Sequence, residues 1–302
     1  MVLLMPIYGH MKANKRRTFL LFGAFILLFL AVGYGLGIYL GEPLVGLTVA
    51  AVIALVVMLF SYYGGQQAIT AMAGARPVSR EDEPYLYHTV EGLSIAAGIP
   101  TPKAYIIESD IPNAFAAGRK PEQAVVAVTR GLLKRLNRVE LEGVIAHEIS
   151  HIRNYDILIA TMAVVLAGTI VFVSVMARRS LWFGGGRRRS GSGGKGQLLM
   201  LAVIIVLAIL APIFAKILQL AISRQREYLA DAAAAELTGY PEGLATALEK
   251  ISGMQEPESR LDNQALQSLY IVNPALGARG TASGLFATHP ATEKRIERLR
   301  SM

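Results

Sequence analysis

Apolar residues along this 302-residue chain are gathered into four long blocks that hold almost no charge. Each block approaches the roughly 20 apolar residues that a helix needs to cross the hydrocarbon core of a bilayer. The pattern therefore predicts a mainly α-helical membrane protein with about four transmembrane helices. The blocks run from Thr18 to Leu40, Leu44 to Tyr63, Ile157 to Met176 and Leu198 to Leu220.

The first two blocks are separated by only three residues, Gly41 to Pro43, so they should form a tight antiparallel hairpin. A cluster of cations precedes the first block, as in a signal peptide, but its apolar run exceeds the roughly 7 to 15 residues of a cleaved signal. The sequence therefore predicts an uncleaved anchor. The cations are Lys12, Lys15, Arg16 and Arg17.

The segment from residue 64 to residue 156 has mixed character and should fold outside the bilayer. Its periodicity predicts an amphipathic helix, two short strands and a helix that begins at Asn137. Asn137 can cap this helix, and Glu140, three residues later, completes a capping box. The first helix is expected over Glu81 to Ala97, and the strands over Lys103 to Glu108 and Ala124 to Thr129.

The last part of the chain, residues 221–302, should also lie outside the bilayer. Helical periodicity is expected from Arg224 to Leu237 and from Ala291 to Leu299. The interval from Ser252 to Gly284 has little periodicity and should be a partly mobile loop. A second loop, rich in Gly, Ser and Arg, is expected from Ser180 to Gly196.

Composition supports the membrane assignment and narrows the chemistry. The chain is 53% hydrophobic and 17% charged, below the roughly 25% charged residues usual in soluble domains. Its net charge of +8 comes mostly from cations beside the apolar blocks, which favours membrane flanks over a nucleic-acid partner. There is no cysteine, so a metal would have to be held by imidazole and carboxylate groups.

Two histidines four residues apart form the strongest chemical signal, in His147-Glu148-Ile149-Ser150-His151. On a helix this spacing returns both imidazoles to one face, where they can share a zinc ion. Glu148 projects beside them and can take a proton from the attacking water. The alternative is a harmless pair of surface histidines on one helix face.

A catalytic zinc site of this kind needs a third protein ligand from elsewhere. Glu227 is the candidate, because it lies on a predicted helix with Asp231 one turn later, able to orient a liganding imidazole. The alternative is a solvated helix whose Arg and Glu side chains pair with one another. The combination with the two histidines favours the metal site.

These features resemble the HtpX family of membrane zinc proteases, relatives of the CAAX prenyl proteases. The resemblance covers nearly the whole chain and implies a zinc-dependent endopeptidase with one Zn²⁺ per chain, held by His147, His151 and Glu227. It also implies a role in membrane protein quality control under stress. The matching pieces are the amino-terminal hydrophobic hairpin, Asn113-Ala114-Phe115-Ala116, the strand and turn Val125 to Leu133, the zinc helix continuing into Arg153-Asn154-Tyr155-Asp156, a second hydrophobic pair, the segment with Glu227 and Asp231, Tyr270-Ile271-Val272-Asn273-Pro274, and Thr288-His289-Pro290.

The resemblance divides the chain into four parts. Residues 1–63 form the transmembrane hairpin, and residues 157–220 form a second hydrophobic pair with the loop 180–196. Residues 64–156 and 221–302 together form a zincin-like α+β metalloprotease domain with a small sheet, assembled from two chain segments.

Three further positions carry weaker predictions. His289 could donate to the developing oxyanion, with Arg295 holding it or binding substrate, or it could be an ordinary loop residue. The segment with Asn113, Ala114 and Phe115 could border a cleft where an extended substrate adds a strand to the sheet edge. The alternative is a simple turn with a buried Phe115.

A shared metal requires the segments before the third block and after the fourth block to lie on one side of the membrane. The cation-rich loop from Arg178 to Lys195 would then lie on the opposite side, against the positive-inside tendency. Because the first helix usually dominates orientation, we expect a multi-pass protein of the cytoplasmic membrane with its active site in the cytoplasm. A shallow, non-spanning second pair would also remove the conflict.

The expected partners are the lipid bilayer and polypeptide substrates, above all membrane proteins, because the zinc helix runs directly into the third block. The sequence does not fix the oligomeric state. Two alternatives remain open, a metal-binding membrane scaffold without turnover and a CAAX-type protease that processes prenylated proteins. A transporter would need ionisable residues inside its spans, and the four blocks contain only Lys216.

Overall fold

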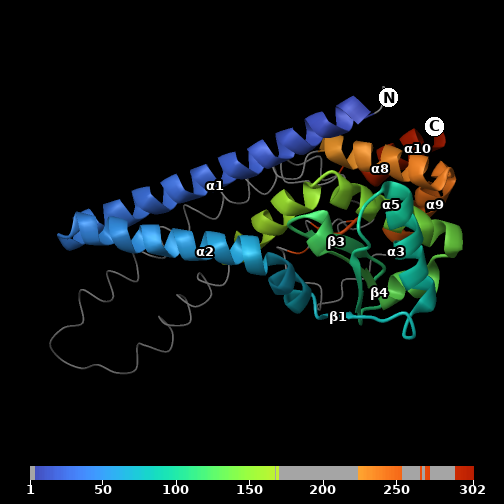
Figure 1. Cartoon of the computed structure of the whole chain (residues 1–302), viewed down its shortest axis with the longest axis horizontal. Coiled ribbons are helices and arrows are strands. Elements are labelled where there is room, and N and C mark those ends of the chain that lie inside the picture. The colour runs from blue at the N-terminus through green and yellow to red at the C-terminus, as the bar shows by residue number, and fades with distance from the viewer. Residues whose placement is uncertain (1–3, 167, 170–223, 254–265, 267–268, 273–289) are drawn as a thin grey trace.

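The chain has two visibly different parts, a pair of long helices and a domain in which shorter helices surround a small sheet (Figure 1). A computed structural model describes residues 4–166, 168–169, 224–253, 266, 269–272 and 290–302. These residues are mainly helical and include one mixed sheet of four strands. The predicted mixture of many helices with a small sheet is confirmed.

The amino-terminal hairpin is confirmed and depends on small residues. Helices α1 (Leu4–Leu40) and α2 (Pro43–Met72) are joined at Gly41, whose φ of 85° suits glycine. A Cβ atom at Gly33 would lie 2.2 Å from the Cβ of Ala50, and one at Gly46 would lie 2.3 Å from the Gly33 carbonyl oxygen. The helix backbones therefore touch, as small residues allow in membrane helix pairs.

Both hairpin helices expose large apolar side chains, with Phe19 and Leu44 each 74% exposed. Within the described chain, two helices are long and apolar enough to cross a membrane, α2 throughout and α1 from Thr18 to Ile38. The third predicted block, Ile157 to Met176, is described only in part, and four transmembrane helices are not confirmed. Its described start lies in the helix Asp156–Leu166, where Ile157, Met162 and Leu166 are buried in the domain. By length and composition, the bent pair Arg138–Arg153 and Asp156–Leu166 counts as a third candidate span if it is taken as one broken helix. The block Leu198 to Leu220 and the loop Ser180 to Gly196 lie outside the described residues.

Helix α2 belongs to both parts of the molecule. Its 30 residues correspond to about 45 Å of helix, more than the roughly 30 Å of a hydrocarbon core. Its last turns enter the domain, where Ile69 is fully buried and Gly65 faces the side chain of Thr161 in the helix after α5. The hairpin and the domain are therefore joined by one uninterrupted helix.

The sheet has the strand order β1-β2-β4-β3. Strands β2 (Lys103–Ile107) and β4 (Ala124–Thr129) are parallel and confirm the two predicted strands. Strands β1 (Ala75–Pro77) and β3 (Ala114–Gly118), both antiparallel to their neighbours, were not predicted. Strand β3 reads Ala-Phe-Ala-Ala-Gly and is buried on both faces, so it lacks the polar alternation that marks a half-exposed strand.

Helix α5 (Arg138–Arg153) runs through the centre of the domain and contacts α3, α8, α9 and β3. It begins with the predicted capping box between Asn137 and Glu140. Helices α3 (Pro84–Ala97), α8 (Arg224–Thr238) and α10 (Thr292–Arg300) match predicted helices, whereas α4 (Arg130–Arg135), α9 (Pro241–Ser252) and the short 3-10 turn Pro121–Gln123 were not predicted.

Few residues of the predicted loop from Ser252 to Gly284 are described, and those at 269–272 form turns and bends. Within it, Leu266, Tyr270, Ile271 and Val272 are all buried. The Tyr270 ring meets the Phe115 ring edge to face at 5.9 Å. Residues 269–272 therefore form a short irregular crossing of the core, which has no helical or strand periodicity.

Two glycine substitutions should have opposite effects on stability. In α5 a Cβ atom at Gly143 would lie 2.7 Å from the backbone nitrogen of Leu244 in α9, so Gly143→Ala should destabilise the protein by about 1–3 kcal/mol through overpacking. In α3 a Cβ atom at Gly92 meets nothing within 4 Å, so Gly92→Ala should stabilise by about 0.5–1 kcal/mol. Thermal unfolding in detergent measures both, and equal effects would contradict the packing described for α5 and α9.

Candidate metal centre

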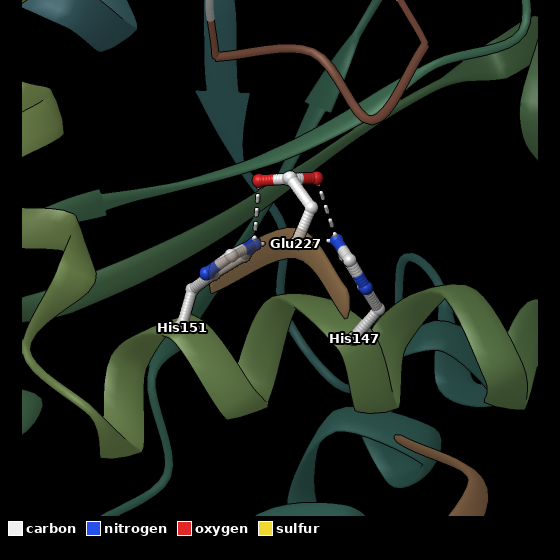
Figure 2. Close-up of side chains that lie close together, drawn as sticks. All are labelled: His147, His151 and Glu227. Carbon is white, nitrogen blue, oxygen red and sulfur yellow. Dashed lines mark hydrogen bonds and ion pairs between the residues drawn. The ribbon is translucent and has the colours of Figure 1, made fainter. Parts of the chain in front are cut away.

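The structure brings together the three residues that the sequence predicted as metal ligands. Figure 2 shows His147 and His151 on one face of α5, with the carboxylate of Glu227 from α8 above them. His147 and Glu227 are buried, and His151 is partly buried. Although many residues separate α5 from α8 in sequence, their close packing places all three side chains at one point.

The distances within this cluster fit a single zinc ion. The two Nε2 atoms are 3.2 Å apart, and Glu227 Oε2 and Oε1 lie 3.7 Å and 3.5 Å from Nε2 of His147 and His151. Zinc bonds of about 2.0–2.1 Å in a tetrahedron place the ligand atoms about 3.3 Å from one another. One ligand atom from each of the three side chains lies within 4.8 Å of the others, so the three could hold one ion together.

An aspartate stands behind each imidazole. The Nδ1 atom of His147 lies 3.0 Å from Asp231 Oδ1, and Nδ1 of His151 lies 3.0 Å from Asp156 Oδ2. A carboxylate partner keeps the proton on Nδ1, which leaves a lone pair on each Nε2. With metal bound, both Nε2 lone pairs would face the ion, whereas without metal a proton on one Nε2 atom is donated to the other across 3.2 Å. The donor set therefore fits a metal.

Asp231, one turn after Glu227 in α8, is fixed by a buried arginine. The Arg295 guanidinium, 1% exposed, donates from Nε and Nη2 to the two carboxylate oxygens of Asp231, at 2.9 and 2.7 Å. Burial opposes ionisation of Asp231, but the Arg295 charge and the hydrogen bonds outweigh it and hold its pKa at about 2. Arg295 thus braces the aspartate behind His147.

The electrostatics of His147 and Glu148 follow from burial and their neighbours. Burial lowers the pKa of His147, but hydrogen bonds to Asp231 and Glu227 outweigh it and raise that pKa to about 9. Burial raises the pKa of Glu148 above its ordinary value, and the nearby imidazoles of His147 and His151 oppose this rise. A carboxylate with a raised pKa is a better proton acceptor near neutral pH.

The segment Asn113 to Phe115 leads into β3, the edge strand of the sheet, and not into a simple turn. The Asn113 side chain donates to the Val272 carbonyl at 2.9 Å and accepts from the Ala114 amide at 3.0 Å. The Ala114 carbonyl accepts from the Ile271 amide at 3.1 Å. Ile271 of the same chain therefore pairs with Ala114, the first residue of this edge strand. Phe115 is buried, as expected if this segment does not border a substrate cleft.

Two of the weaker predictions end differently. His289 lies outside the described residues, so its expected role stays a prediction. Arg295 donates to the Ile271 carbonyl as well as to Asp231, which ties the irregular crossing to the metal centre. The contact of Asp156 with His151 was not predicted from the sequence. Its position five residues after His151, at the start of the next helix, is the signal that could have revealed it.

Comparison with known proteins gives a consistent result. The family model described as Peptidase family M48 matches residues 80–302. A protease HtpX homolog from Streptococcus gordonii is 46% identical over 299 residues, covering 98% of this chain and 100% of that protein. A protease HtpX homolog from Dictyoglomus thermophilum is 47% identical over 295 residues, covering 98% and 94%.

A solved structure is also similar. The crystal structure of S. mikatae Ste24p aligns with a TM-score of 0.49 and 20% identity, covering 92% of this chain and 62% of that chain. The resemblance to the HtpX family is confirmed by sequence alone, over nearly the full length of the chain. Since the family model matches most of the chain, this protein belongs to peptidase family M48 and is a metalloprotease.

Proposed function

We propose that the protein is a zinc endopeptidase of the membrane surface that hydrolyses misfolded or membrane-associated proteins, in membrane protein quality control. The observation that carries this proposal is the cluster of His147, His151 and Glu227, with Glu148 on the helix that carries the two histidines. Residues 64–156 and 221–302 would form one metalloprotease domain, which the contact of α5 with α8 supports.

Bound zinc would supply a Lewis acid that polarises the scissile carbonyl and makes water acidic enough to react at neutral pH. The Glu148 carboxylate accepts a proton from the attacking water and passes it to the amine that leaves when the peptide bond breaks. Its raised pKa suits both transfers. Asp231 and Arg295 keep His147 in the tautomer that presents Nε2 to the metal.

Separating metal binding from turnover tests this mechanism. Glu148→Ala removes the proton acceptor but no ligand atom, so the purified variant should keep one zinc per chain and lose about 10²-fold or more in peptide hydrolysis. His147→Ala removes a ligand and should lose both zinc and activity. Metal analysis and cleavage of a casein-like substrate measure the two effects. Normal cleavage by Glu148→Ala would refute the mechanism, and zinc without any cleavage in the unaltered protein would favour the scaffold alternative.

Zinc binding should release protons, because the metal takes the neutral imidazole of His147 and this residue has a pKa of about 9 without metal. The raised folded-state pKa means that His147 is protonated at pH 7, so the apparent zinc affinity should rise with pH until about pH 9. Calorimetry of zinc binding at pH 7 in buffers of different ionisation enthalpy measures the protons released. A binding enthalpy that is the same in every buffer would contradict this.

The membrane arrangement is the second part of the proposal. We place α1 and α2 across the cytoplasmic membrane with the domain in the cytoplasm, and the block Leu198 to Leu220 in a second hydrophobic pair. Arg119, after β3, stacks on the rings of Tyr62 and Tyr63 at 5.0 and 4.8 Å. Tyrosine and arginine are enriched where a helix leaves the hydrocarbon core. The contact of Arg119 with Tyr62 and Tyr63 would therefore mark the membrane surface. This supports a domain that lies directly on the bilayer, within reach of membrane proteins as substrates.

The absence of cysteine makes single-cysteine labelling a clean test of orientation. Glu42→Cys lies in the exposed hairpin turn and Ser301→Cys lies at the exposed end of the chain. In intact cells a membrane-impermeant maleimide should label only the cysteine at position 42, and lysed cells should label both. Labelling of position 301 in intact cells would reverse the orientation.

A further inference from the structure

Asp156 lies between a candidate metal ligand and a buried arginine. Its Oδ2 atom is 3.0 Å from Nδ1 of His151, and its Oδ1 atom is 3.7 Å from Nη1 of Arg226. Arg226 is itself buried and directly precedes Glu227 in α8. Two neighbouring residues of α8 thus have different contacts: Glu227 belongs to the metal cluster, and Arg226 contacts Asp156. Asp156 is therefore held from two sides, by His151 and by Arg226.

The backbone reaches this arrangement through a turn that is unfavourable for most side chains. Tyr155 has a φ of 59°, and among the described residues it is the only one other than glycine with a positive φ. A bulky residue in this region is uncommon and costs free energy. Through this turn α5 gives way to the helix Asp156–Leu166 at an angle of 88°. Asp156 therefore comes first in the new helix and returns toward His151, in the last turn of α5.

A simpler role for Asp156 is to stabilise the start of its own helix, where a negative charge is favourable. That role explains an acidic residue at this position but not the direction of its carboxylate. Both oxygens are directed at groups of other elements, one at the His151 ring and one at the Arg226 guanidinium. The same relation, a buried aspartate between an imidazole and an arginine, recurs in His147, Asp231 and Arg295.

We propose that Asp156 is a positioning residue of the metal site, which fixes the tautomer and the orientation of His151 through Nδ1 and depends on the left-handed turn at Tyr155. The inference rests on the proposed function, because it assumes that His151 is a ligand. Its consequence is that the metal site and the 88° bend between the two helices stabilise each other. A group behind a liganding histidine typically changes metal affinity by about 10–100-fold.

Zinc affinity of the purified full-length protein tests the proposal by competition with a chromophoric chelator. Asp156→Ala should weaken zinc binding by about 10–100-fold. Asp156→Asn keeps an oxygen that accepts from His151 Nδ1 and should recover most of the loss. The visible absorption of the Co²⁺-substituted protein gives a second readout, since a reoriented His151 changes the ligand field. A role limited to stabilising the helix start would change the unfolding temperature and leave both readouts unaltered.

A matched control is Asp82→Ala. Asp82 is an exposed aspartate just before α3 that accepts hydrogen bonds from the backbone and side chain of Ser79. Its loss should leave zinc affinity unchanged. Equal affinity of Asp156→Ala and the unaltered protein, or an Asp156→Asn variant no better than Asp156→Ala, would overturn the inference alone. Failure of the unaltered protein to bind zinc at all would overturn the proposed function and this inference with it.

Discussion

Two imidazoles held with their Nε2 atoms 3.2 Å apart in a buried site are the constraint around which the domain is arranged. Without metal, this approach needs a proton on one Nε2 atom that is donated to the other, and with metal both Nε2 lone pairs would face the ion. The protein accordingly surrounds them with acidic groups, Glu227 in front and Asp231 and Asp156 behind. Without metal, the same carboxylates raise the pKa of His147 and stabilise protonated rings. The site is thus prepared for positive charge, from either protons or a metal.

This constraint explains why distant parts of the chain must meet. The helix α5 supplies two groups at helical spacing, but the third comes from α8, and the arginine that fixes Asp231 comes from α10 at the carboxyl end. Arg295 also binds the Ile271 carbonyl, whose own amide pairs with β3. The edge strand, the irregular crossing and the last helix are therefore linked to the metal cluster by directional bonds, in addition to their apolar packing.

Local patterns made part of this structure predictable. The apolar hairpin, the capping box at Asn137 and the four-residue spacing of His147 and His151 each depend on residues close in sequence. Strand β3 was missed because it is apolar on both faces. For the apolar helix Asp156–Leu166 the pattern alone does not separate burial in protein from burial in lipid, because a core helix and a membrane helix share one composition. The contact of Asp156 with His151 depends on the backbone turn at Tyr155, which no spacing rule for regular helices contains.

The uninterrupted course of α2 from Pro43 to Met72 has a mechanical consequence. A domain joined to its membrane anchor by a flexible linker can take many positions above a bilayer. A domain joined by a continuous helix keeps a single position. In the arrangement proposed above, Tyr63 lies at the membrane surface and contacts Arg119, while Gly65 and Ile69 already pack against the domain, so α2 fixes the domain directly on the bilayer. Helix α2 would therefore hold the metal centre at a constant distance from the lipid. The stretch of polypeptide open to cleavage would be selected by that distance as well as by its sequence.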